Sequence, residues 1–112
     1  MKVQTQAHGN VAVLVAHGPL VADEVHDLRH AVQSACDMVT KGLVVDMVDV
    51  PYLDSAGVEL LLEMGGVHLP PHQRPKFAAL TETCREALEL TDTLLRLDVF
   101  DTVENALRGC QQ

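Results

Sequence analysis

The amino-acid sequence predicts an α/β domain, and two observations predict it. Short runs of β-branched and apolar residues alternate with amphipathic runs of helical period along the chain. Residues 43–50 are apolar and nearly continuous, which is typical of a strand that is covered on both faces. Strands that alternate with helices form right-handed crossovers and a largely parallel sheet. The 112 residues suffice for one compact domain, so we expect a single domain over residues 1–112.

The first half of the chain predicts a strand, a helix and a second strand. Residues 11–16 (VAVLVA) form a compact apolar run that ends at a Gly-Pro pair, which indicates a buried strand. Residues 22–39 repeat apolar side chains at helical spacing, so we expect an amphipathic helix that ends at Gly42. Residues 43–50 then form the central strand.

The third strand follows a helix and a proline-rich loop. Asp54 can cap a helix that stops early at Gly65-Gly66. The segment VHLPPHQRP comes next, and its prolines predict a loop. Residues 76–80 (KFAAL) are short and apolar, so we expect a short strand there.

The last part of the chain predicts two helices with an extended piece between them. Thr81 or Thr83 can begin the first of these helices, which breaks near a Thr-Asp pair at residues 91–92. Residues 99–100 (VF) form the extended piece. Asp101 with Glu104 three residues later fits a capping box, which predicts the start of the final helix.

Composition and charge narrow the classes of function. The chain is 47% hydrophobic and 21% charged, as expected of an ordinary globular protein. Its net charge of −8 repels phosphate backbones and anionic lipids, so we expect no direct nucleic-acid or membrane partner. A protein partner with a basic patch would instead be attracted. The sequence shows neither a signal peptide nor an apolar stretch of roughly 18 residues, so we expect a cytoplasmic protein.

Cysteine and histidine patterns indicate neither a metal nor a cofactor. The three cysteines are widely spaced, which favours free thiols in a reducing compartment. His26 and His30 are four residues apart, and His68 and His72 flank a Pro-Pro pair, but such pairs are more often solvated than bound to zinc. The sequence contains no G-x-S-x-G, Walker-type or H-E-x-x-H motif. We therefore expect no enzymatic activity, no metal and no cofactor.

The most informative segment joins the central strand to the helix after it. Pro51 leads into the four residues Asp54, Ser55, Ala56 and Gly57, so a hydroxyl lies at a helix N-terminus beside the carboxyl end of a strand. Open α/β sheets usually keep their functional sites at that edge. Asp-Ser before an apolar helix is common capping chemistry, and its position after a buried strand makes a functional interpretation stronger.

Gly57 and the local charge suggest a switch. Gly57 falls in the first helical turn, where glycine costs roughly 1 kcal/mol relative to alanine, and we interpret it as open backbone on which another protein can lie. Residues 46–63 contain five acids and no Lys or Arg. Phosphorylation of Ser55 would add about −1.5 to −2 charge units there. The helix dipole tolerates such a phosphate, but a partner fitted closely over a neutral Ser55 would be excluded.

These residues resemble the STAS domain, the family of bacterial anti-sigma-factor antagonists. The family pattern D-x-x-x-V-P-x-x-D-S-x-G-hydrophobic is met at Asp46, Val50, Pro51, Asp54, Ser55, Gly57 and Val58. Gly18 and Leu20 fit the G-x-L that precedes the first helix in the family. The segment LTDTLLRLDVFDTVENAL is similar to the usual ending of the domain. The resemblance extends over nearly the whole chain.

The resemblance implies a fold, a role and partners. The fold would be a single STAS domain, with a four- or five-stranded mostly parallel or mixed sheet and about four helices. An anti-sigma factor that is itself a serine kinase would phosphorylate Ser55, and a PP2C-type phosphatase would reverse this. The unphosphorylated form would bind that kinase and release a sigma factor, and a weak homodimer is compatible with this role. The partner-binding residues would be Leu20, Asp46, Asp54, Ser55, Ala56, Gly57 and Val58.

A second role fits the same resemblance. STAS-like domains also act as stressosome scaffolds, as subunits of lipid-transport complexes and as tails of anion transporters. Such a protein would dock a partner through the helix end at residues 54–58 without acting on a sigma factor. The sequence leaves both roles open.

Overall fold

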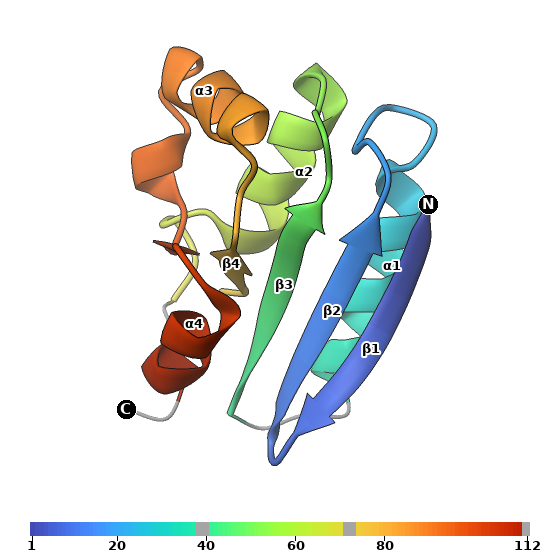
Figure 1. Ribbon diagram of the computed structural model, residues 1–112, viewed down its shortest axis with the longest axis vertical. Helices are drawn as coiled ribbons and strands as arrows, with labels where there is room; N and C mark the ends of the chain where they lie inside the picture. The colour runs from blue at the N-terminus through green and yellow to red at the C-terminus, as the bar shows by residue number, and fades with distance from the viewer. Residues whose placement is uncertain (38–40, 71–73, 111–112) are drawn as a thin grey trace.

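The computed structural model describes residues 1–37, 41–70 and 74–110. Within these ranges five strands form one mixed sheet in the order β1-β2-β3-β4-β5 (Figure 1). The only antiparallel pair among them is β1 with β2, and the remaining neighbours are parallel. The predicted α/β class is confirmed. The strands are β1 (Lys2–His8), β2 (Val11–His17), β3 (Gly42–Asp49), β4 (Lys76–Ala78) and β5 (Val99–Phe100).

Helices lie on both faces of the sheet. Behind the sheet in Figure 1 lie α1 (Val25–Cys36) and α2 (Ser55–Gly65), while α4 (Val103–Cys110) lies in front of it. At the upper end lies α3 (Glu82–Leu90), and the short 3-10 helix η2 (Leu94–Arg96) follows it in the chain. None of the helices in the described ranges is long and apolar enough to cross a lipid bilayer.

Side chains of the central strand alternate between two hydrophobic cores. Leu43, Val45 and Met47 point toward the larger core, which they share with α1, α2 and α3. Val44 points the other way and packs in the smaller core beneath α4. This alternation follows from the two-residue period of a strand and explains why the run at residues 43–50 is almost wholly apolar.

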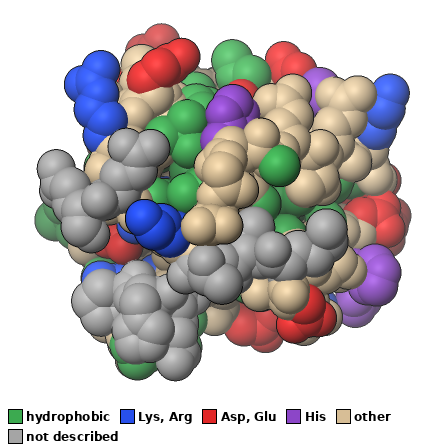
Figure 2. All heavy atoms as spheres, turned by 90° about the horizontal axis from the view of Figure 1, so that it is seen from below, with side chains coloured by type: hydrophobic (Ala, Val, Ile, Leu, Met, Phe, Trp, Pro, Cys, Tyr) green, Lys and Arg blue, Asp and Glu red, His purple; other side chains and the backbone are tan. Residues whose placement is uncertain are grey.

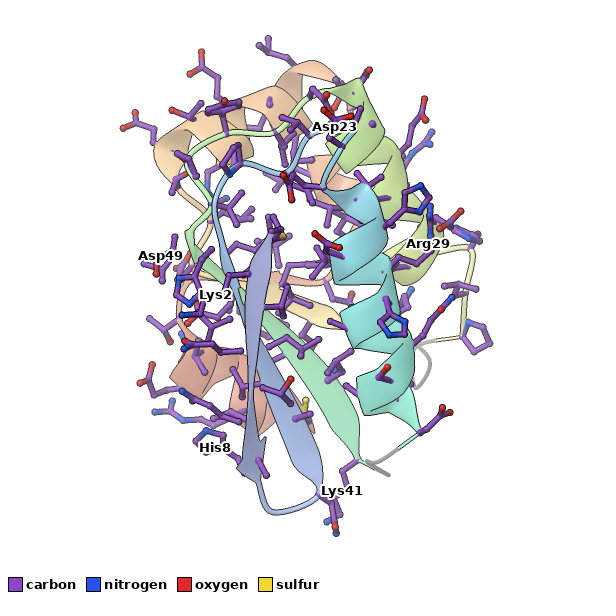
Figure 3. All side chains as sticks on the ribbon, turned by 90° about the vertical axis from the view of Figure 1, so that its right-hand side faces the viewer. Lys2, His8, Asp23, Arg29, Lys41 and Asp49 are labelled. Atoms are coloured by element: carbon purple, nitrogen blue, oxygen red, sulfur yellow. The ribbon has the colours of Figure 1, made fainter. Side chains whose placement is uncertain are left out.

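The N-terminal strand β1 was not predicted from the sequence. Most of its side chains are polar and exposed, because β1 is the outer strand of the sheet and α1 packs over only one of its faces. Lys2 and His8 point away from α1 in Figure 3, toward the same side as Asp49. An edge strand with this pattern lacks the apolar signal of a buried strand, although polar edges are common in native sheets.

Two expected helix boundaries are wrong. The helix predicted over residues 22–39 begins at Val25, after a turn, and ends at Cys36 in the described part of the chain. Gly42 therefore does not end this helix; it opens β3, where a Cβ atom would lie 2.8 Å from Sγ of Cys110. Residue 39 lies outside the described residues.

The helix caps in the second half are partly as expected. Thr81, rather than Thr83, caps α3 and accepts a hydrogen bond from the amide of Cys84 at 3.2 Å. The capping box of Asp101 with Glu104 is wrong, because the hydroxyl of Thr102 accepts from the amide of Asn105 at 3.1 Å. Asp101 lies instead 3.5 Å from the guanidinium of Arg85.

Candidate functional site

The carboxylate of Asp54 organises the start of α2. Its Oδ1 accepts a hydrogen bond from the amide of Gly57 at 3.0 Å, which is the N-cap that the sequence predicted. Its Oδ2 accepts from the amide of Ala22 at 3.1 Å, in the turn before α1. The bond from Gly57, followed by that from Ala22, lowers the pKa of Asp54 below its ordinary value. The carboxylate is therefore a link between two segments as well as a cap.

Backbone hydrogen bonds reinforce this link. The amide of Leu20 donates to the carbonyl of Tyr52 at 3.0 Å, and the amide of Asp54 donates to the carbonyl of Leu20 at 3.2 Å. Leu20 and Leu53 form an isolated parallel bridge. The loops that leave β2 and β3 are thus held together at the carboxyl ends of two adjacent parallel strands, where α/β proteins usually place their sites.

Ser55 is the first residue of α2, and its side chain is exposed. The hydroxyl is therefore reachable from outside the molecule. The amides in the first turn of a helix have no partner within the helix. Asp54 takes the amide of Gly57, and the other amides at this end of α2 suit a phosphate group. The arrangement is chemically compatible with phosphorylation of Ser55 without unfolding.

The interpretation of Gly57 as open backbone is wrong. Gly57 is buried, and a Cβ atom there would lie 2.4 Å from the carbonyl oxygen of Leu20 and 3.0 Å from Cβ of Leu53. No side chain fits at that distance. Glycine is required because the loop from β2 crosses directly over the first turn of α2, so the reason is packing within the domain.

The other predicted partner-binding residues do not all meet at Ser55. Ala56 is half-buried next to it, and Val58 is 9% exposed at the edge of the larger core. Leu20 is 0% exposed, so its side chain supports the site from inside. Asp46 lies on β3 one residue from Val45 and Met47, and therefore points to the opposite face of the sheet from α2. Its Oδ1 accepts from the amide of Val48 at 3.1 Å.

A hollow of about 420 Å³ opens beside Ser55, between α2 and α3. Its wall on α3 was missed in the sequence. The signal was Leu90, which follows the buried Leu88 by two residues and so falls on the other side of the helix, where it is 80% exposed. The lining residues are Leu53, Asp54, Ser55, Val58, Glu59, Ala87, Leu90 and Thr91.

The histidines of the two predicted pairs can be placed only in part. Within the described residues no three His, Cys, Asp or Glu side chains lie close enough to hold an ion. The ring of His26 lies 3.2 Å from the guanidinium of Arg29, which does not favour a bound cation. His72, which was paired with His68 in the sequence, lies outside the described residues.

A comparison with protein families shows to which family this chain belongs. The family model described as the STAS domain matches residues 2–106. The chain belongs to the STAS domain family. The five-stranded mixed sheet and the helix that begins at Ser55 are thus a STAS fold. A search of curated protein sequences found no match.

Solved structures share this STAS fold. An anti-sigma factor antagonist from Mycobacterium paratuberculosis is 21% identical, with a TM-score of 0.81 over 99% of this chain and 94% of that chain. The anti-sigma factor antagonist SpoIIAA in its unphosphorylated form is 18% identical, with a TM-score of 0.71 over 98% of this chain and 96% of that chain. Murine Slc26a9, an anion transporter, is 18% identical, with a TM-score of 0.74 over 95% of this chain but 18% of that chain.

Proposed function

We propose that this STAS domain is an anti-sigma-factor antagonist that is switched by phosphorylation of Ser55. The unphosphorylated form binds an anti-sigma factor serine kinase in the cytoplasm and thereby releases a sigma factor. Phosphorylated protein does not bind, and a PP2C-type phosphatase restores it. The domain itself catalyses no reaction. The observation that carries the proposal is the exposed hydroxyl on the first residue of α2, at the edge where β2 and β3 end. The likeness to two anti-sigma factor antagonists over almost their full length adds support.

The switch acts through the cost of removing water. Ser55 lines the hollow between α2 and α3, so a partner that covers the hollow also covers the hydroxyl. Covering a neutral hydroxyl costs far less than covering a phosphate, whose charge would have to be dehydrated beside apolar walls. In the free protein the helix N-terminus stabilises that phosphate. Phosphorylation therefore removes binding while leaving the fold unchanged.

Phosphorylation is tested with a candidate anti-sigma factor serine kinase. The protein and this kinase are incubated with ATP, and mass spectrometry locates the phosphate. We expect one phosphate on Ser55 and none on the Ser55→Ala variant. A phosphate elsewhere, or none at all, would contradict the assignment of Ser55.

The effect of charge is tested with two variants of nearly equal volume. Ser55→Asp should bind the kinase roughly 100-fold more weakly than the unphosphorylated wild-type protein does, since an uncompensated charge would be buried. Ser55→Asn carries no charge and should bind within roughly five-fold of wild type, which is the range of a surface polar change. Isothermal titration calorimetry gives both affinities. Equal binding of Ser55→Asp and Ser55→Asn would refute the dehydration mechanism.

The alternative role is a scaffold or a subunit of a larger assembly. The observation that favours it is the fold shared with part of the anion transporter Slc26a9. A protein of this type would dock its partner through residues 54–58 and would not change transcription from any sigma-dependent promoter. Deletion of the gene followed by transcript profiling separates the two roles, because only an antagonist leaves one sigma regulon silent.

A further inference from the structure

We propose that the hollow beside Ser55 receives one large apolar side chain of the partner protein, and that Lys or Arg residues flank that side chain. The inference rests on the proposed function only in that a protein docks at this end of the domain. It adds the chemistry of the segment that docks. A partner of this kind would be recognised by α3 as well as by α2.

The walls of the hollow indicate an apolar occupant. Leu53 and Val58 form one side, and Ala87 and Leu90 of α3 form the other. Leu90 is 80% exposed, so most of its apolar surface is in contact with water and contributes nothing to the core. Covering such a wall with an apolar side chain removes apolar surface from water, which favours association.

The rim of the hollow indicates basic flanks. Among the described residues, the charged side chains that line it are the carboxylates of Asp54 and Glu59, with no Lys or Arg. Two further acids, Glu89 and Asp92, lie at the end of α3, next in the chain to Leu90 and Thr91 of the hollow. Acidic groups on α2 and at the end of α3 attract a cationic segment.

Charge also excludes two other occupants. A second copy of this chain would bring another net charge of −8 to an acidic rim, so like charges would oppose a homodimer through this surface. An anionic lipid surface would be repelled for the same reason. A basic protein segment with an apolar side chain is the occupant that meets both the walls and the rim.

A synthetic peptide tests the proposal without the kinase. The probe is an end-blocked pentapeptide of sequence RKLKR, titrated to millimolar concentration into ¹⁵N-labelled protein and followed by NMR. We expect the amide signals of Ser55, Glu59 and Thr91 to shift together. The peptide RKSKR should bind roughly ten-fold more weakly, because the buried leucine is lost. The peptide EELEE should not bind.

Two exposed leucines provide a matched pair of protein variants. Leu90→Ser should weaken RKLKR binding roughly five-fold, because the wall on α3 loses its largest apolar group. Leu95→Ser changes a leucine that is 93% exposed and lies outside the hollow, so RKLKR should bind within roughly two-fold of wild type. Both side chains are mostly exposed, so both variants should keep the wild-type fold, and amide signals away from the substitution should stay in place.

Several results would overturn the proposal. RKLKR and RKSKR could bind equally, which would show charge attraction alone. The shifts could be absent or could centre on Leu95, which would place the apolar contact elsewhere or nowhere. If Ser55 is nevertheless phosphorylated by the kinase and Ser55→Asp still loses the complex, the proposed function stands and only the hollow's role fails.

Discussion

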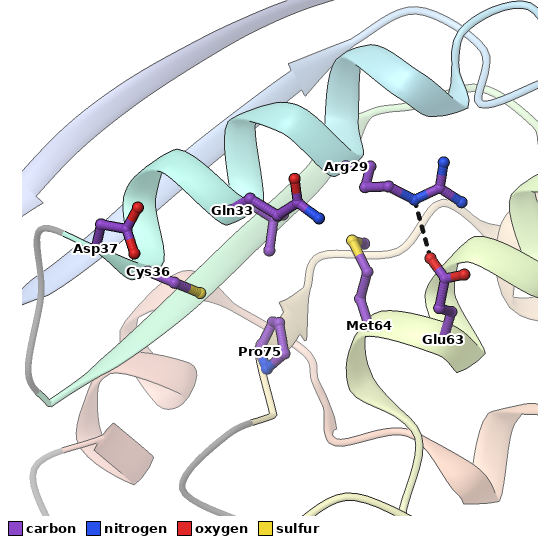
Figure 4. A pocket seen from close by; sticks show the side chains of 8 residues that line it. Arg29, Gln33, Cys36, Asp37, Glu63, Met64 and Pro75 are labelled. Atoms are coloured by element: carbon purple, nitrogen blue, oxygen red, sulfur yellow. Dashed lines mark hydrogen bonds and ion pairs between the residues drawn. The ribbon is translucent and has the colours of Figure 1, made fainter.

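Two hollows on this domain differ in size and in what surrounds them. The larger, about 630 Å³, lies between the later turns of α1 and α2, away from Ser55 (Figure 4). Arg29 and Glu63 form an ion pair of 2.9 Å across it, so these two charges are satisfied within the domain. The smaller hollow beside Ser55 has apolar walls and carboxylates on its rim. The larger hollow is therefore the less suitable docking site for a partner, although its volume is greater.

The two ends of the molecule also differ, in their charged side chains and in the bonds of their backbone. Seen from below, the end opposite Ser55 carries Lys, Arg, Asp, Glu and His side chains interspersed around exposed hydrophobic groups (Figure 2). At the other end Asp54 joins the turn before α1 to the start of α2. The Ser55 end is therefore distinguished by its backbone bonds between two loops and by a hollow whose described charged lining residues are carboxylates. Substitutions at three places, Gly57, Asp54 and the Arg29–Glu63 pair, test this difference.

The largest effect is expected from Gly57→Ala. Helix propensity alone would stabilise α2 by about 1 kcal/mol, but the new Cβ would lie 2.4 Å from the carbonyl oxygen of Leu20. Overpacking of this kind costs about 1–3 kcal/mol and must shift backbone here. We expect the free energy of unfolding, measured by urea titration, to fall by about 2 kcal/mol.

A second helical glycine provides the control for Gly57→Ala. At Gly109 in α4 the nearest atom to a new Cβ is Cε of Lys76 at 3.0 Å, which is the end of a flexible side chain. Gly109→Ala should therefore leave stability within about 1 kcal/mol of wild type. An equally small effect of Gly57→Ala would mean that the loop from β2 does not pack tightly against the first turn of α2.

A smaller effect is expected from Asp54→Ala. The variant loses the cap on Gly57 and the link to Ala22, so the melting temperature at pH 7 should fall by several degrees. The folded-state pKa of Asp54 is lowered, so its contribution is present above the ordinary aspartate pKa of about 4 and is lost as the pH falls through the lowered value.

The difference in melting temperature between wild type and Asp54→Ala should therefore shrink between pH 7 and pH 3. Calorimetric scans at several pH values measure it. Asp54→Asn keeps an oxygen for the amide of Gly57 and should lose less stability at pH 7. A difference that stayed constant with pH would mean that the carboxylate charge contributes nothing.

The smallest effect is expected at the larger hollow. The Arg29 side chain is 32% exposed and that of Glu63 is 60% exposed, so their ion pair is well solvated. Arg29→Met or Glu63→Gln should change the free energy of unfolding by less than about 0.5 kcal/mol. Neither variant should alter binding of the kinase. A loss of binding in either one would move the functional surface to the larger hollow.

The sequence predicted the buried parts of the fold better than its surface. Residues 11–16 and 43–50 were recognised because buried strands need continuous apolar runs. The strand β1 could not be recognised in this way, since its polar side chains face solvent at the sheet edge. Its position depends on pairing with β2, which is a non-local contact.

The candidate site was predicted at its centre and less well at its margins. Asp54 and Ser55 could be placed because capping is local chemistry. Gly57 was misinterpreted because its neighbour Leu20 is far away in the sequence. Asp46 was grouped with Ser55 because both fit the family pattern, yet its side chain points to the other face of the sheet. Leu90 was missed because the hollow forms only when α3 packs beside α2.

The bonds of Leu20 to Tyr52 and Asp54 have a consequence for the thermodynamics of recognition. A surface whose two loops are already ordered loses little conformational entropy when it is covered, so more of the contact energy appears as affinity. The free protein is in this sense preorganised. We therefore expect adaptation of shape to be left to the partner, with nearly rigid-body docking on this side.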